Sequence, residues 1–144
     1  MSASDIQHAI DSTSQGNTST LDVPPGTRIA LEGAAIIITG IRVVLSSRAE
    51  GAIIDGDRRS RIFTLFAGAA LELTGISCTN GRAGGLGTLP VEAAGGAFFV
   101  ANGSSITLVG AHVSNCTSGR PGDTLVRALR SQIACPLFSH VMIE

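Results

Sequence analysis

The chain has 144 residues, which suits one domain, and at this size roughly two thirds of the unfolded surface can be buried. Its residues are 44% hydrophobic and include 18 glycines but only 3% aromatics, so we expect a core of Ile, Val, Leu and Ala on closely spaced backbone. All ten basic residues are arginine and the net charge is −1. Because nucleic acid binding needs a concentrated basic surface, no nucleic acid partner is expected.

Neither a membrane span nor a signal peptide is predicted. The apolar runs are far too short to cross a bilayer. Met1 is followed by a polar stretch, where a signal peptide would have a basic segment and then an apolar run. The residues themselves therefore do not indicate a compartment.

Residues 4–13 are predicted to form a short amphipathic helix. Ser4 and Gln7 have the spacing of a capping box, in which each side chain binds the free backbone amide of the other residue. Ile6 and Ile10 fall on one helical face, which we expect to cover the first layer of the fold as an N-terminal cap. After a polar linker, the stretch TLDVPPGT predicts a short strand that ends at Pro24 and Pro25.

Three stretches that begin at Arg28, Phe63 and Phe98 repeat at a spacing of 35 residues. Within each stretch, apolar residues alternate with polar or small ones, which is typical of a strand. A repeat of this length with short strands and glycine turns indicates a solenoid whose coils stack equivalent residues. The residues that we expect to stack are Gly33, Gly68 and Gly103; Gly40, Gly75 and Gly110; Ile36, Leu71 and Ile106; and Ile38, Leu73 and Leu108.

Each repeat is longer than a minimal coil and must carry an excursion. The first excursion covers residues 47–60 and includes a further predicted strand at Ala52 to Ile54. The second is the glycine-rich stretch from Gly81 to Gly96, which we interpret as a flexible loop because it lacks the lysine of a phosphate-binding loop. Such excursions from a regular stack are the expected places for function.

Several stretches resemble a known family: IIDGD, LELTGISCTNG and GGAFFVANGSSITLVGAHVSN are similar to coils of right-handed parallel β-helix proteins of the pectin-lyase-like group. They are most similar in style to the repeats of polymorphic outer-membrane and related extracellular proteins. The resemblance covers residues 4–119 and implies an all-β, right-handed parallel β-helix of three to four coils at residues 19–119. It also implies an extracellular or cell-surface location. It does not imply one activity, because the architecture hosts lyases, hydrolases, epimerases, adhesins and structural rods.

The tail, residues 120–144, departs from the coil pattern. Asp123 is a suitable N-cap for a helix with Leu125, Leu129 and Ile133 on one face, and Pro136 would end that helix before a last apolar strand. An open end of a stack exposes strand edges and core, so we expect the tail to be a C-terminal cap of a single domain at residues 1–144. The alternative is that a second copy of the chain covers this end.

The densest polar cluster contains two aspartates and three arginines: Asp55, Asp57, Arg58, Arg59 and Arg61. Carboxylates two residues apart on an extended segment face the same side, so this pair could hold Ca²⁺ or act as an acid and a base with an arginine. The family resemblance adds that some β-helix polysaccharide lyases combine calcium-binding acids with a catalytic arginine. The alternative, which we favour, is a turn whose aspartates bind local backbone amides and whose arginines neutralise them.

No other candidate site is stronger. His8, His112 and His140 fall in different predicted segments, and Cys78, Cys116 and Cys135 lack metal-ligand spacing. A threonine rank of the kind that binds ice would begin with Thr39 and Thr74 but stops at Val109.

The sequence therefore favours a non-catalytic structural or binding module without a cofactor. We expect it to self-associate into a homo-oligomer through a solenoid end or a strand edge. The alternative is a carbohydrate-active enzyme, a lyase or hydrolase, that acts on an acidic polysaccharide with Asp55 and Asp57 as acid/base or metal groups and Arg58, Arg59 or Arg61 as their partners.

Overall fold

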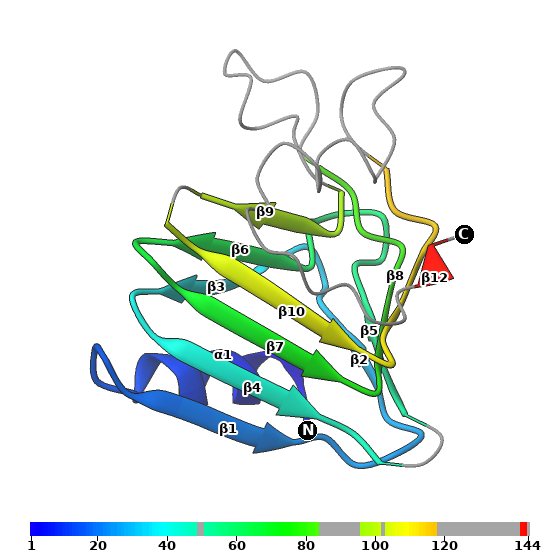
Figure 1. Cartoon of the computed structure of the whole chain (residues 1–144). Coiled ribbons are helices and arrows are strands. Elements are labelled where there is room, and N and C mark those ends of the chain that lie inside the picture. Colours follow the sequence, from blue (N-terminus) through cyan, green and yellow to red (C-terminus); the bar gives the residue numbers. More distant parts are fainter. Residues whose placement is uncertain (49–50, 84–95, 102, 118–141, 144) are drawn as a thin grey trace.

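A computed structural model describes residues 1–48, 51–83, 96–101, 103–117 and 142–143 (Figure 1). Within these residues the chain forms one short helix and a series of short strands. The elements are α1 (Ala3–Asp11), β1 (Thr18–Asp22), β2 (Arg28–Ala30), β3 (Ile36–Thr39), β4 (Arg42–Ser46), β5 (Ala52–Asp55), β6 (Phe63–Phe66), β7 (Ala70–Thr74), β8 (Ile76–Thr79), β9 (Phe98–Val100), β10 (Ser105–Val109), β11 (His112–Ser114) and β12 (Met142–Ile143).

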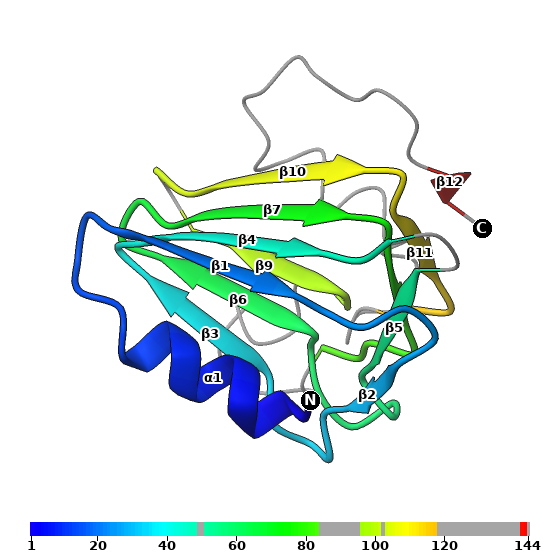
Figure 2. The same cartoon turned by 90° about the horizontal axis from the view of Figure 1, so that it is seen from below.

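The strands form three parallel sheets, which we call sheets A, B and C. Sheet A has the order β1-β4-β7-β10, sheet B has β12-β11-β8-β5-β2, and sheet C has β3-β6-β9. From β1 to β11, consecutive strands belong to A, B and C in rotation, so each pass of the chain adds one strand to each sheet (Figures 1 and 2). The predicted all-β class and the parallel strands are confirmed, and the strands expected before Pro24 in TLDVPPGT and at Ala52 to Ile54 are present as β1 and β5.

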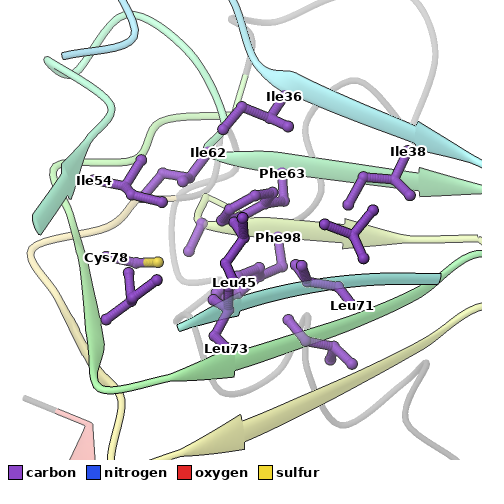
Figure 3. Close-up of a cluster of buried hydrophobic side chains, with 14 of the residues drawn as sticks. Ile36, Ile38, Leu45, Ile54, Ile62, Phe63, Leu71, Leu73, Cys78 and Phe98 are labelled. Atoms are coloured by element: carbon purple, nitrogen blue, oxygen red, sulfur yellow. The ribbon is translucent and has the colours of Figure 1, made fainter. Parts of the chain in front are cut away.

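Alternation along the strands decides which side chains enter the core. In β10, Ile106 and Leu108 are buried, while the polar residues between and before them are exposed. The inward side chains of all three sheets meet in one cluster, which Figure 3 shows around the parallel rings of Phe63 and Phe98, whose centroids lie 5.9 Å apart. Cys78 belongs to this cluster and is fully buried, as expected for a cysteine that packs as a small apolar residue.

The predicted 35-residue register is correct for only one step of the stack. Ile106 pairs with Leu71 and Leu108 with Leu73, which is the predicted spacing. Leu73, however, pairs with Leu45, 28 residues earlier, and Leu45 pairs with Leu21, 24 residues earlier.

The residues of the first predicted repeat are therefore not equivalent to those of the other two repeats, because they lie in a different sheet. Ile36 and Ile38 lie in sheet C, where they pair with Phe63 and Leu65. Thr39 also belongs to sheet C and is not equivalent to Thr74 of sheet A. The error has a physical cause: strands of all three sheets show the same alternation, so the pattern does not distinguish one sheet from another.

The N-terminal helix is confirmed, but its capping residues were predicted wrongly. The N-cap is Ser2, whose hydroxyl accepts from the Asp5 amide at 3.2 Å while the Asp5 carboxylate accepts from the Ser2 amide at 2.7 Å. The helix therefore begins at Ala3, and Gln7 has a different role. The Gln7 side chain accepts from the Ile37 amide at 2.9 Å and donates to the Ile37 carbonyl at 3.1 Å.

The contacts of Gln7 explain how α1 covers one edge of the fold. β3 is the edge strand of sheet C, and its Ile37 is the residue whose backbone groups point away from β6. The Gln7 carboxamide makes the two hydrogen bonds there that a neighbouring strand would otherwise make. Ile6 and Ile10 of the same helix enter the core, as the sequence predicted.

At the other end of sheet B, Met142 and Ile143 form β12 and pair in parallel with β11. The helix predicted from Asp123 and most of the glycine-rich excursion lie outside the described residues. Within the described part of the chain, no helix has the length and apolar character that crossing a membrane requires.

Candidate functional site

The predicted cluster around Asp55 lies where the strands of sheet B end. Asp55 is the last residue of β5, and Asn80 and Asn115 directly follow the neighbouring strands β8 and β11. The Asn80 amide donates to Asp55 Oδ1 at 2.9 Å, and the Asn115 amide donates to Asn80 Oδ1 at 2.6 Å. These bonds form a continuous polar ladder, the Asp55–Asn80–Asn115 ladder, across three passes of the chain.

Backbone geometry explains why asparagine occupies two positions of this ladder. Asn80 has a φ of 54° and Asn115 a φ of 52°, both in the left-handed region. Among residues with a side chain, Asn tolerates this conformation comparatively well. The sharp turn after each strand and the side-chain ladder therefore require the same residue type.

The Asp55 carboxylate is buried and engaged on both oxygens. Its residue is only 6% exposed. Oδ1 accepts from Asn80 and also from the Asp57 amide at 2.9 Å, and Oδ2 accepts from the guanidinium of Arg28 on β2. One carboxylate thus connects three successive strands of sheet B and the turn that follows it.

The charge state of Asp55 follows from these contacts. Burial opposes ionisation, but the hydrogen bonds from the Asp57 amide, Asn80 and Arg28, together with the Arg28 charge, outweigh it and hold the pKa of Asp55 below its ordinary value. Asp55 is therefore an anion in the folded protein at neutral pH.

The other predicted site residues do not converge on Asp55. The Asp57 side chain is 58% exposed, and its nearest cation is Arg59, at 3.8 Å. Arg58 donates to Asn115 Oδ1 at 3.5 Å. Arg61 lies in the segment that leads into β6, and its guanidinium carbon is 5.2 Å from the centre of the Phe99 ring.

Sequence reasoning missed the main partners of Asp55. Arg28 lies 27 residues away, and only the register of β2 against β5 brings it close, because it pairs with Ile53 there. Asn80 and Asn115 could have been identified as stacked neighbours from the sequence, since they lie 35 residues apart and both follow a predicted strand.

The residues around Asp55 do not fit Ca²⁺. Calcium takes six to eight oxygen ligands, many of them from carboxylates. Both Asp55 oxygens already accept hydrogen bonds, and a guanidinium lies against one of them, where it would repel a cation. The described residues contain no group of three or more acidic, histidine or cysteine side chains that could hold a metal ion.

The described thiols and histidines do not form a nucleophilic site. Cys116 donates to the Ser114 carbonyl at 3.2 Å and accepts from the Gly81 amide at 3.2 Å. Burial raises the pKa of the Cys116 thiol, which disfavours the reactive thiolate. His8 lies in α1 and His112 begins β11, while Cys135 and His140 lie outside the described residues.

An open hollow of about 570 Å³ lies at the N-terminal end, between α1 and the segment from Ala30 to Ile36. Its lining contains none of the residues of the predicted Asp55 cluster. The Asp55 cluster and this hollow are therefore separate features of the molecule.

Comparisons of the chain with protein-family models, with curated proteins and with solved structures find no significant match.

Proposed function

We propose that this chain is a non-catalytic structural module built as a right-handed parallel β-helix of three to four coils, and that it self-associates. The rotation of consecutive strands through three parallel sheets supports the β-helix, since each pass then corresponds to one coil. The parallel register is kept over four strands of sheet A, as stacking of coils requires.

The observation that carries the non-catalytic role is that both carboxylate oxygens of Asp55 already accept hydrogen bonds. A general acid or base must reach its substrate and exchange a proton near the working pH. Asp55 is buried, its oxygens are occupied by Arg28, Asn80 and the Asp57 amide, and its pKa is lowered. These properties suit a carboxylate that stabilises the stack.

The alternative is a carbohydrate-active enzyme that acts on an acidic polysaccharide with this cluster. It would have to rely on Asp57 and Arg59, which lie at the surface. A second carboxylate beside Asp57 would come from Asp55, whose hydrogen bonds would first have to break. The geometry therefore favours the structural role.

Turnover assays distinguish the two functions. The folded chain is incubated with polygalacturonate and with alginate, with and without Ca²⁺, while ultraviolet absorbance reports unsaturated products and a colorimetric assay reports new reducing ends. We expect no turnover under any of these conditions. Turnover that is lost in a folded Asp57→Ala variant would overturn the non-catalytic proposal and support the enzyme.

A further inference from the structure

The three strands of the first pass differ in how their open edges are covered. β1, β2 and β3 each lie at the edge of a sheet in the described structure. The edge of β3 is covered by α1 through Gln7. β2 is only three residues long. β1 has five residues, and Figure 2 shows it crossing the end of the molecule with α1 alongside β3 and not in front of β1.

The backbone groups at the β1 edge can be assigned from its pairing with β4. Arg42 donates to the Asn17 carbonyl and Val23 donates to the Ser46 carbonyl, so Asn17, Ser19, Leu21 and Val23 direct their backbone groups toward β4. Because alternate residues of a strand use opposite edges, the amides and carbonyls of Thr18, Thr20 and Asp22 point away from the sheet.

The side chains of β1 do not protect this edge. Natural edge strands are commonly protected by charged side chains, above all lysine, by proline within the strand, by an inward-pointing charge or by a bulge. β1 has the sequence TSTLD, in which the one charged residue, Asp22, is the last of the strand and points outward, and the prolines come only after the strand. Leu21 faces the core but is only partly buried, so this edge also leaves apolar surface uncovered.

We infer that β1 pairs with β1 of a second copy of the chain, antiparallel and about a two-fold axis at Thr20. This inference rests on the proposed self-association and names its surface. With Thr20 opposite Thr20 of the second copy, Thr18 lies opposite Asp22, and every residue with open backbone groups meets another such residue. Each of these pairs can exchange two N–H···O bonds.

The side chains favour the antiparallel arrangement. Asp22 lies opposite a threonine, so like charges do not face each other as they would if two β1 strands were parallel and in register. Leu21 lies opposite Ser19 of the second copy, which covers its exposed part. A symmetric contact also closes after two copies, so it produces a dimer and not a fibre.

Such a contact is small, and we expect a weak dimer. Interfaces below about 1,000 Å² are typical of transient association. Sedimentation equilibrium of the full chain from about 10 μM to about 1 mM should show the apparent mass rising from one chain toward two.

Two substitutions of Thr20 test the edge. Thr20→Pro removes the open amide without removing a bond to β4, since the Thr20 amide does not face β4, and it should keep the chain monomeric over the whole range. Thr20→Val keeps the amide and should dimerise like the parent. Thr20→Cys tests the two-fold axis, because residues of such a pair have Cα atoms about 5.5 Å apart, within disulfide range.

The matched control for cross-linking is Thr107→Cys. Thr107 lies in the same outward column of sheet A as Thr20, through Glu72 and Val44, but on β10 at the opposite edge of the sheet, where its backbone groups face β7. Under mild oxidation, Thr20→Cys should form covalent dimers at least tenfold faster than Thr107→Cys or the parent. Equal rates would overturn the inference even if Thr20→Pro fails to fold.

The remaining outcomes separate this inference from the proposed function. If the parent dimerises and a folded Thr20→Pro variant dimerises equally well, the chain self-associates through another surface and the β1 inference is wrong. If the parent is monomeric at every concentration, both the inference and the proposed self-association are wrong, while the turnover assays still decide the non-catalytic role.

Discussion

The guanidinium of Arg28 on β2 donates to the carboxylate of Asp55 on β5, and the two side chains differ sharply in exposure, at 60% for Arg28 and 8% for Asp55. The ion pair therefore joins a surface cation to a buried anion. Arg28 can turn to water if its partner is lost, but the Asp57 amide and the Asn80 side chain depend on Asp55 for their hydrogen bonds.

We expect Asp55→Asn to lower the free energy of unfolding by about 1–3 kcal/mol, since hydrogen bonds to a charged group contribute about that much. Urea denaturation followed by circular dichroism measures the change. The matched control is Asp57→Asn, whose side chain is 58% exposed and should change stability by less than about 0.5 kcal/mol. Equal effects of the two substitutions would contradict a structural role for Asp55.

The contribution of Asp55 should depend on pH. Its pKa is lower in the folded protein than in the unfolded chain, where an aspartate titrates near 3.9, so the unfolded state binds the proton more readily. The stabilisation is complete above about pH 4 and is lost as the pH falls through the folded pKa.

The stability difference between the parent and Asp55→Asn should accordingly shrink as the pH falls below about 4. Comparison with the variant is needed because the pKa of Asp5 is also lowered, by hydrogen bonds from Ser2, and Asp5 titrates in both proteins. A difference that does not shrink as the pH falls below about 4 would argue against a charged Asp55 in the fold.

Local strand pattern predicted the class of this fold well and its register poorly. The alternation in β7 and β10 marked these strands correctly, since Leu71, Leu73, Ile106 and Leu108 are all inward. The register failed at Ile38, because inward positions of sheets A and C are both filled by aliphatic residues. Passes of unequal length cannot be aligned from such residues alone.

The helix contact with β3 gives a further prediction. Gln7→Ala removes both hydrogen bonds to the Ile37 backbone and should cost about 1–2 kcal/mol of stability. Native-state hydrogen exchange is the sharper measurement, because the Ile37 amide should exchange at least tenfold faster while the amides within α1 change little. Ser4→Ala is the control, since the Ser4 hydroxyl bonds the hydroxyl of the N-cap Ser2 at 2.9 Å and not the Ile37 backbone. An unchanged Ile37 amide would mean that Gln7 does not cover this edge.

Two glycines of the predicted repeat should respond differently to alanine. Gly75 has a φ of 62° and an added Cβ would lie 2.5 Å from the Ser47 carbonyl oxygen, whereas Gly110 has a φ of 55° and open space around the same position. Gly110→Ala should therefore cost only the left-handed backbone strain, about 1–2 kcal/mol. Gly75→Ala adds a clash with backbone and should cost at least about 2 kcal/mol more. Similar melting temperatures for the two variants would contradict the close approach at Gly75.

The candidate site was predicted in part, and what was missed depends on stacking. The favoured interpretation of IIDGD as a turn whose aspartate binds a local amide matches the bond from the Asp57 amide to Asp55. The expectation that neighbouring arginines neutralise Asp55 does not match its contacts, because the cation is Arg28. Neighbours in sequence are poor guides to the cation here, since Asp55 bonds Arg28 and Asn80 from adjacent passes while Arg59 pairs with Asp57.

The two described cysteines should be inert while the protein is folded. Burial raises the pKa of both Cys78 and Cys116, and the thiolate is the form that alkylating reagents attack. We expect iodoacetamide at pH 8 to leave both unmodified in the native protein and to label both in urea, with mass spectrometry of peptides as the readout. Cys116 is only partly buried and should react first as the urea concentration rises, because local opening of its turn exposes it while Cys78 needs the core to unfold. Labelling of Cys78 before Cys116 would contradict the placement of Cys78 among Leu73, Ile54 and the other core side chains.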